Sequence, residues 1–320
     1  MSSTELKLPL VDLDGYINPR APGDRERVIA EVREACESFG FFQTTGHNIP
    51  LQTQKELLKS IDTLFELPQE EKRKLSYLEN PCRRGYEESG MSLRTGDALP
   101  DSKEAYYIGR EDPVVEHGGF YGPNVWPPLP TEEFRTPVWE YYQATNKLAV
   151  VIWEILLQGL GYPTSVMEAF TKRPMVIMKM IRYPPLEKTL PDQFGVGAHT
   201  DFGGVTVLLQ QPGRDGLEVW TEERKEWVPV QALEDVYVIN CGDMISQWSG
   251  GRYKSAKHRV INKADKQSRL SCATFYHGDA LARNPLNNDD PNKATVGQRL
   301  IARFQKQFTL PPEFTAAASS

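Results

Sequence analysis

The chain has 320 residues, of which 39% are hydrophobic and 25% are charged, and its formal net charge is −6 at pH 7. These values are ordinary for a folded globular protein that is long enough to bury a large core. Because no linker divides the sequence, we expect residues 1–320 to form a single unit. The acidic balance argues against nucleic acid or an anionic membrane surface as a partner, so the expected partner is a small molecule.

The N-terminal segment has no apolar stretch typical of a secretory signal, and no run in the chain approaches the length of a membrane span. The four cysteines are widely spaced and form no CxxC pair, which is typical of reduced thiols. We therefore expect a cytoplasmic protein. Nothing in the sequence indicates an oligomeric state.

The first half of the chain predicts helices and a few short strands. Strands are predicted over 8–13, over 103–108 and within GFFQTTGHNIP (40–50), where Gly46 and Pro50 end the strand. Helical spacing predicts helices over 25–39, 52–66, 69–75 and 132–160. Residues 80–101 are rich in charge and turn formers, which predicts a loop. The part around Arg84, Tyr86 and Met91 is either a lid over a substrate pocket or a plain surface loop.

The second half of the chain changes its apolar period from 3.6 toward 2 at about Met175. Many short strands separated by turn signals predict a sandwich or barrel of the jelly-roll type. A helix is expected within 292–308, packed on the outside through four apolar residues. These are Leu300, Ile301, Phe304 and Phe308.

His199, Asp201 and His258 are the candidate metal ligands. Residues i and i+2 of a strand point to one face, so His199 and Asp201 can reach one ion, and His258 would be brought in by the fold. Two imidazoles and one carboxylate leave open positions that suit Fe(II). With five histidines and 43 acidic residues, however, roughly 0.7 such close pairs would arise by chance. Taken alone, His258 could equally be an exposed residue flanked by two cations.

Arg269 and Ser271 alternate on a later predicted strand and therefore project to one face. A guanidinium and a hydroxyl can hold a carboxylate by charge-assisted hydrogen bonds, which indicates an acidic co-substrate. Without further context, the same pair could be an ordinary ion-pair site of a barrel.

Three segments of the second half, GVGAHTDFGGVTVLLQ, CGDMISQWSGGRYKSAKHRVINK and RLSCATFYH, carry a family resemblance. In content, order and spacing they resemble the iron- and 2-oxoglutarate-dependent dioxygenases of the isopenicillin N synthase-like superfamily. The segments LPLVDLDG, ESFGFFQTTGHNIP and IRYPP are similar to that family's N-terminal region and tyrosine-bearing strand. The resemblance implies a mainly β fold with flanking helices, a double-stranded β-helix (distorted jelly roll) over 175–280, an N-terminal dioxygenase region over 6–115 and a C-terminal helix over 292–308.

The resemblance also implies roles for individual residues. The metal triad falls on the three ligands already named, and the RxS motif on Arg269 and Ser271, which would bind the distal carboxylate of 2-oxoglutarate. Tyr183 matches the tyrosine that hydrogen-bonds the same carboxylate. Where many members have Asn two residues before this tyrosine, the chain has Ile181, and Arg182 follows it. Because neighbouring strand residues face opposite sides, we interpret Arg182 as a surface or interface cation.

The implied activity is oxidation of a small organic molecule, with Fe(II), 2-oxoglutarate and O2 as cofactors and ascorbate as a possible reductant. Hydroxylation, desaturation, cyclisation and ring expansion all belong to the family's chemistry. Phe202, Tyr107 and Arg110 are candidate substrate contacts, although Tyr107 could be core and Arg110 a solvated charge. The remaining histidines, His47, His117 and His277, are interpreted as hydrogen-bonded structural residues.

Three other functions stay open at this point. The first is an iron oxidase of the same fold that takes no 2-oxoglutarate and holds another carboxylate on the RxS pair. The second is a binding module that kept the barrel and lost its chemistry, against which the intact triad argues. The third is structural zinc, which usually has four ligands rich in Cys, whereas no Cys is close to His199 or His258 in sequence.

Overall fold

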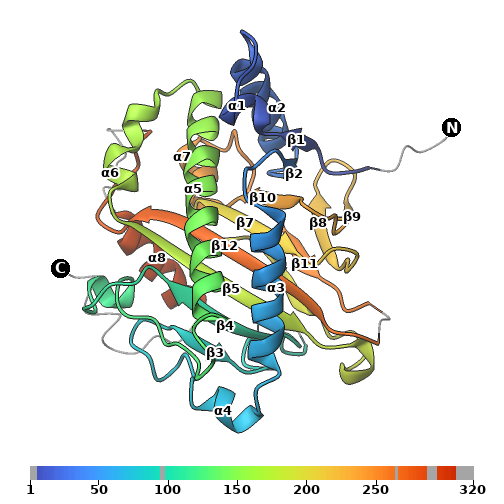
Figure 1. Ribbon diagram of the computed structural model, residues 1–320. Helices are drawn as coiled ribbons and strands as arrows, with labels where there is room; N and C mark the ends of the chain where they lie inside the picture. Colours follow the sequence, from blue (N-terminus) through green and yellow to red (C-terminus); the bar gives the residue numbers. More distant parts are fainter. Residues whose placement is uncertain (1–5, 94–97, 264–265, 287–293, 308–320) are drawn as a thin grey trace, which may run out of the picture.

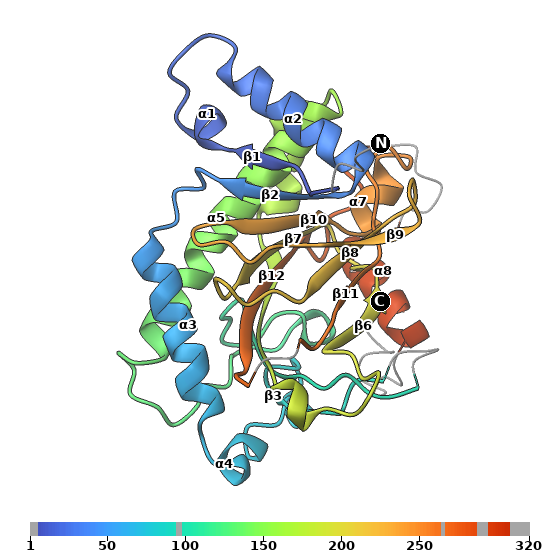
Figure 2. The same ribbon diagram turned by 90° about the vertical axis from the view of Figure 1, so that its right-hand side faces the viewer.

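The computed structural model describes residues 6–93, 98–263, 266–286 and 294–307. Two β-sheets face each other, and long helices cover the outer face of the larger sheet (Figure 1). Seen from the side, the smaller sheet lies on the side of the larger sheet that is turned away from these helices (Figure 2). The predicted mainly β architecture with flanking helices is confirmed.

Within the described residues, the larger sheet has eight strands in the order β1, β2, β10, β7, β12, β5, β4, β3, and the smaller has four in the order β6, β11, β8, β9. The strands of the larger sheet are β1 Leu10–Asp12, β2 Phe41–Thr45, β3 Gly85–Glu87, β4 Glu104–Gly109, β5 Pro174–Tyr183, β7 Val205–Gln210, β10 Tyr237–Cys241 and β12 Arg269–Asp279. The strands of the smaller sheet are β6 Val196–His199, β8 Leu217–Thr221, β9 Glu226–Pro229 and β11 His258–Val260.

Eight α-helices lie in the described residues: α1 Asp14–Ile17, α2 Asp24–Ser38, α3 Leu51–Phe65, α4 Gln69–Arg73, α5 Arg135–Gly159, α6 Glu168–Thr171, α7 Asp243–Trp248 and α8 Val296–Gln307. Helices α2, α3 and α5 pack together and bury one apolar stripe each against the larger sheet. No helix of the described chain is both long and apolar enough to cross a membrane.

Strand β5 separates the two cores of the molecule. Its side chains alternate, so that Met178 and Met180 lie in the core under the helices while Ile181 and Tyr183 lie in the core between the sheets. Arg182 points to the helical side, where its Nε donates to Glu104 at 2.7 Å and its Nη2 donates to the Phe65 carbonyl at 2.8 Å. The predicted opposite orientation of Arg182 and its two neighbours is therefore confirmed, and Ile181 occupies the barrel interior.

The predicted loop over 80–101 is wrong at its centre. Residues 85–87 form β3, which pairs with β4 and extends the larger sheet. Arg84 and Tyr86 are buried, with 3% and 2% of their surface exposed, so neither a mobile lid nor a surface loop describes them, whereas Met91 is 42% exposed. The sequence does not predict this strand, because its three residues, GYE, show no apolar alternation. Its partner strand also follows only after a further charged stretch.

The predicted C-terminal helix is present as α8. Leu300 and Ile301 are buried in the larger core, as expected from the apolar spacing. The side chain of Phe304 and the whole of Phe308 lie outside the described residues.

Candidate metal and co-substrate site

The two histidines of the predicted triad lie directly opposite each other on neighbouring strands. The antiparallel register of β6 and β11 pairs His199 with His258, and their ring centroids are 4.2 Å apart. The Nε2 atoms of both rings lie 3.8 Å from Oδ1 of Asp201. One ligand atom from each of the three residues lies within 4.8 Å of the others, which brings the predicted metal ligands together.

One detail of that prediction is wrong. Strand β6 ends at His199, so Asp201 belongs to the bend that follows and does not share a strand face with the histidine. The bend still directs its carboxylate toward both imidazoles. His258 is buried, with 8% of its surface exposed, which excludes the alternative of an exposed histidine between two surface cations.

Backbone carbonyls fix the orientation of both imidazoles. Nδ1 of His199 lies 2.9 Å from the Gly197 carbonyl, and Nδ1 of His258 lies 3.2 Å from the Ala256 carbonyl. A carbonyl can only accept, so Nδ1 carries the proton and Nε2 is the nitrogen with the lone pair that can bind a metal. Among the described residues this cluster contains no cysteine, and two nitrogens with one carboxylate oxygen fit Fe(II) better than structural zinc.

Two polar side chains on the larger sheet hold the carboxylate of Asp201. The Thr206 hydroxyl donates to its Oδ2 at 2.6 Å, and the Asn240 amide donates to the same atom at 2.8 Å. Burial opposes ionisation of Asp201, but the imidazoles of His258 and His199 and these two hydrogen bonds lower its pKa. The other carboxylate oxygen of Asp201, Oδ1, therefore faces the two histidines. Sequence reasoning missed both supporting residues, although a polar residue inside the apolar strand VYVIN was a usable signal.

Replacing Thr206 with valine is expected to weaken Fe(II) binding about 10-fold to 100-fold, because a hydrogen bond that orients a ligand is lost while the side-chain shape is kept. Anaerobic titration of the purified variant with Fe(II) would measure this. Thr221→Val is a suitable control, because Thr221 is also buried on a strand but lies at the end of β8. Equal affinity of wild type and Thr206→Val would contradict the assigned role.

The bend after Asp201 is pressed tightly against the core. A Cβ at Gly203 would collide with the His277 imidazole, and a Cβ at Gly204 would collide with the Trp153 ring, so both positions require glycine for close approach. Between them and the metal ligand, Phe202 is partly buried, and its ring lies 5.0 Å from the guanidinium of Arg303 on α8. Phe202 thus packs against the core under the helices, and its contact with a substrate stays a prediction.

Arg269 and Ser271, the two residues of the predicted carboxylate clamp, lie at the start of β12. Arg269 pairs with Tyr183 across the sheet, and its guanidinium lies 4.7 Å from the tyrosine ring. Nε donates to the Arg214 carbonyl at 2.8 Å and Nη2 donates to the Gln210 side chain at 2.8 Å. Within the described part of the chain, Nη1 of Arg269 and Oγ of Ser271 are buried without a hydrogen-bond partner.

Two orphaned buried donors on one strand face are costly unless a ligand completes them. A carboxylate is the group that a guanidinium and a hydroxyl satisfy together. The side chains present therefore fit the distal carboxylate of 2-oxoglutarate.

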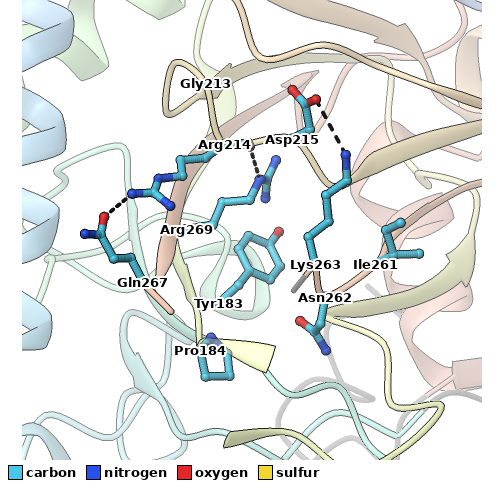
Figure 3. A pocket seen from close by; sticks show the side chains of 10 residues that line it. All are labelled: Tyr183, Pro184, Gly213, Arg214, Asp215, Ile261, Asn262, Lys263, Gln267 and Arg269. Atoms are coloured by element: carbon cyan, nitrogen blue, oxygen red, sulfur yellow. Dashed lines mark hydrogen bonds and ion pairs between the residues drawn. The ribbon is translucent and has the colours of Figure 1, made fainter. Parts of the chain in front are cut away.

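A cavity of about 130 Å³ lies next to Tyr183 and Arg269 (Figure 3). Its walls include Tyr183, Arg269, Arg214 and Lys263, whereas Ser271 and the three metal ligands do not line it. In Figure 3 the guanidinium of Arg269 reaches toward Arg214 above the ring of Tyr183. This cavity therefore borders Tyr183 and Arg269, and the metal ligands are not part of its lining.

The other two substrate candidates differ in position. Tyr107 packs against the core between the sheets and donates its hydroxyl to Glu87 at 2.6 Å, so it faces the barrel interior. Arg110 follows the end of β4 and its Nε donates to Asp112 at 3.3 Å, in an ion-pair group that also includes Arg173. This geometry favours an ion-pair role for Arg110.

Comparison with known proteins agrees with this site. Residues 8–129 match the family described as non-haem dioxygenase in morphine synthesis, N-terminal, and residues 174–278 match the 2OG-Fe(II) oxygenase superfamily. The chain is 68% identical over 313 residues to the 2-oxoglutarate-dependent dioxygenase thnC of Trichoderma harzianum, covering 98% of both chains. It is 44% identical over 312 residues to the 2-oxoglutarate-dependent dioxygenase caaD of Aspergillus niger, covering 97% of both.

The chain belongs to the 2OG-Fe(II) oxygenase superfamily. Its fold also matches the crystal structure of a full-length Neurospora crassa protein in complex with alpha-KG, with a TM-score of 0.81, 23% identity and coverage of 95% of this chain and 98% of that chain. The predicted family, the jelly-roll fold, the enzyme class and the cofactors Fe(II) and 2-oxoglutarate are confirmed.

The spare histidines of this oxygenase behave differently from one another. His47 is buried and accepts the Ile49 N–H on Nδ1 at 3.1 Å, so the structural interpretation is confirmed for it. His277 is also buried, but within the described residues its Nδ1 has no hydrogen-bond partner, contrary to the prediction. Burial lowers the pKa of His277 to about 4, although the negative charge of Asp201 acts in the opposite direction.

His277 should make the oxygenase sensitive to acid. The unfolded chain binds a proton on this residue near pH 6.5 and the folded chain only near pH 4, so its contribution to stability is present above pH 6.5 and is lost as the pH falls. Urea unfolding of wild type and His277→Phe at pH 7 and pH 5 would isolate it. Between pH 7 and pH 5 we expect the free energy of unfolding of the wild type to fall by about 2 kcal/mol relative to that of His277→Phe. A constant difference would refute the lowered pKa.

Proposed function

We propose that this enzyme oxidises a small organic molecule in specialised metabolism and couples the oxidation to conversion of 2-oxoglutarate into succinate and CO2. The observation that carries the proposal is the pair of unpartnered buried donors, Arg269 Nη1 and Ser271 Oγ, inside the barrel that bears the His199, Asp201 and His258 cluster. A metal site beside a carboxylate clamp whose donors have no protein partner is the arrangement that a dicarboxylate co-substrate requires.

In this proposal each residue has a defined task. His199, Asp201 and His258 hold Fe(II), with Thr206 and Asn240 fixing the carboxylate. Fe(II) held by these residues would supply the oxidising chemistry that consumes 2-oxoglutarate and O2.

On the co-substrate side, Arg269 and Ser271 bind the distal carboxylate. Gln210 and the Arg214 carbonyl hold the guanidinium in place. Tyr183 lies against that guanidinium and adds its hydroxyl to the same carboxylate. These contacts would fix the distal end of the co-substrate and so restrict its orientation.

The substrate would occupy the barrel space next to the metal. Phe202, which directly follows the metal ligand Asp201, and Tyr107, on the opposite wall, are the proposed contacts. Arg110 is assigned to its ion pair with Asp112 and not to the pocket. The apolar ring and the polar hydroxyl suit a partly polar organic molecule better than a hydrocarbon.

The experiment is a screen for succinate release with Fe(II), 2-oxoglutarate and a library of small metabolites, followed by mass analysis of products. Succinate formation that rises with one compound class, together with a product that has gained one oxygen atom or lost two hydrogen atoms, supports the proposal. Oxidation of a compound without succinate would instead favour an iron oxidase of the same fold. Ligand binding that is unchanged in a His199→Ala variant with no product would favour a binding module.

A further inference from the structure

A lysine stands on the inner wall of the barrel. Lys179 is on β5, two residues before Ile181 and four before Tyr183, and these two belong to the core between the sheets. Because alternate residues of a strand share a face, Lys179 lies on the same face. Its sheet partners are Ala273 on β12 and Tyr107 on β4. An ammonium group on this face is unusual, because a lysine is seldom placed in a barrel interior without a partner.

Next to Lys179 lies a buried ion pair. The side chains of Glu87 and Lys103 are 2% and 1% exposed, and their charged atoms are 2.7 Å apart. The Glu87 carboxylate also accepts the hydroxyl of Tyr107 at 2.6 Å and, on its other oxygen, the hydroxyl of Ser92. Burial opposes ionisation of Glu87, but Lys179 and Lys103 hold its pKa below the usual range, so it is a carboxylate. Glu87 is therefore already satisfied by three close donors.

Of the two lysines that contact Glu87, Lys179 makes the longer contact. Its Nζ lies 3.4 Å from Glu87, against 2.7 Å for Lys103, and 4.9 Å above the Tyr107 ring. Its side chain is 15% exposed, against 1% for that of Lys103, so Lys179 is the more accessible of the two lysines. Asp101 adds a second carboxylate to this cluster, but it acts on Lys103 and accepts the Gly197 N–H at 2.9 Å. Of the two lysines, Lys179 therefore has the positive charge that nearby carboxylates neutralise less, and it is the lysine on the inner face of β5.

The carboxylate clamp for the co-substrate is elsewhere. Arg269 pairs with Tyr183, whereas Lys179 lies four residues back along β5, roughly 13 Å away along the strand. In the proposed function, Arg269 already binds the distal carboxylate of the co-substrate. A second cation on the same inner wall needs a different anion.

We propose that Lys179 binds an anionic oxygen group of the substrate, either a carboxylate or an ionised enol, and so selects acidic substrates. This inference rests on the proposed function and names the substrate class of that site. Glu87 and the Tyr107 ring lie on one side of the ammonium, which has three N–H donors and, among the described residues, only one carboxylate contact, at 3.4 Å, to share them with. A neutral analogue of the substrate would leave these donors unsatisfied, which is a strong source of discrimination.

The test measures binding to the enzyme loaded with Fe(II) and 2-oxoglutarate under anaerobic conditions. The probes are matched pairs: acetate with acetamide, salicylate with methyl salicylate, and 1,3-cyclohexanedione, which is an ionised enol at neutral pH, with its O-methyl ether. Calorimetry is carried out on the wild type, Lys179→Met and Lys179→Arg. For at least one pair we expect the wild type to bind the anion about 10-fold or more tightly than its neutral partner. Lys179→Met should lose this preference and Lys179→Arg should retain most of it.

Lys188→Met is the matched control, because Lys188 is exposed in the turn that follows the same strand. It should retain the preference of the wild type. Formation of the visible band of the Fe(II) and 2-oxoglutarate complex is recorded for every variant. If the wild type does not form this band, the proposed function fails and not the role of Lys179.

Three results would overturn the inference when that band is intact. The wild type could bind no anion of the pairs, it could bind anion and neutral partner equally, or Lys179→Met could keep the preference. A loss of 2-oxoglutarate affinity in Lys179→Met without any change toward the probes would assign the lysine to the co-substrate instead. If the carboxylates and not the enol show the preference, the substrate group is a carboxylate, and the reverse result identifies an enol.

Discussion

Replacing Asp201 with alanine is expected to abolish tight Fe(II) binding and to lower the rate of succinate formation by at least about a thousandfold. Asp201 supplies the only carboxylate of the described metal cluster, and its Oδ1 lies 3.8 Å from Nε2 of both His199 and His258. Its removal leaves two neutral imidazoles, which bind Fe(II) weakly. Anaerobic metal titration and a succinate assay would measure the two effects.

The control for this variant is Glu187→Ala, which removes one exposed carboxylate from the surface turn after β5. It should bind iron and form succinate like the wild type. If Asp201→Ala kept the affinity of the wild type for Fe(II), the metal cluster would be assigned wrongly.

Replacing Arg269 with leucine is expected to raise the KM for 2-oxoglutarate about 100-fold, because the distal carboxylate would lose its buried charged partner. Arg269 is only 8% exposed, and its Nη1 has no hydrogen-bond partner in the described chain. The KM is measured from initial rates of succinate formation at saturating iron. Binding of Fe(II) alone should be unchanged, since Arg269 is not among the metal ligands.

Arg182→Leu is the matched control for the co-substrate clamp. Arg182 is the residue next to Tyr183, but it points to the helical side and pairs with Glu104 and Glu66. The substitution should lower the free energy of unfolding and leave the KM unchanged. Equal KM values for Arg269→Leu and Arg182→Leu would contradict the binding of 2-oxoglutarate by Arg269.

The shared face of Arg269 and Ser271 could be predicted from the sequence by a short-range rule. The metal ligands, in contrast, could be named only through the family resemblance, because Asp201 lies beyond the end of β6 and His258 is brought in by the sheet register. Arg269 and Ser271 share a face through the alternation of one strand, and the same alternation separates Arg182 from Tyr183. The spacing of the histidines had value only together with the surrounding segments. The family resemblance supplied that context, and the register of β6 and β11 shows how His199 and His258 meet.

The residues that support the site could not be predicted, because they depend on contacts between distant segments. Thr206 and Asn240 reach Asp201 only after β7 and β10 have paired. Glu87 was assigned to a loop, since a charged residue gives no strand signal before its partners Lys103 and Lys179 are known. Buried ion pairs of this kind are invisible to hydrophobic periodicity.

The central claim is that one chain binds Fe(II) and 2-oxoglutarate together, and anaerobic visible spectroscopy tests it most directly. The purified protein is loaded with Fe(II) and then titrated with 2-oxoglutarate. We expect a weak visible charge-transfer band that saturates at one 2-oxoglutarate per chain, is absent with zinc, and needs far more 2-oxoglutarate in Arg269→Leu. Tight Fe(II) binding at the triad with no band at any concentration of 2-oxoglutarate would contradict the account.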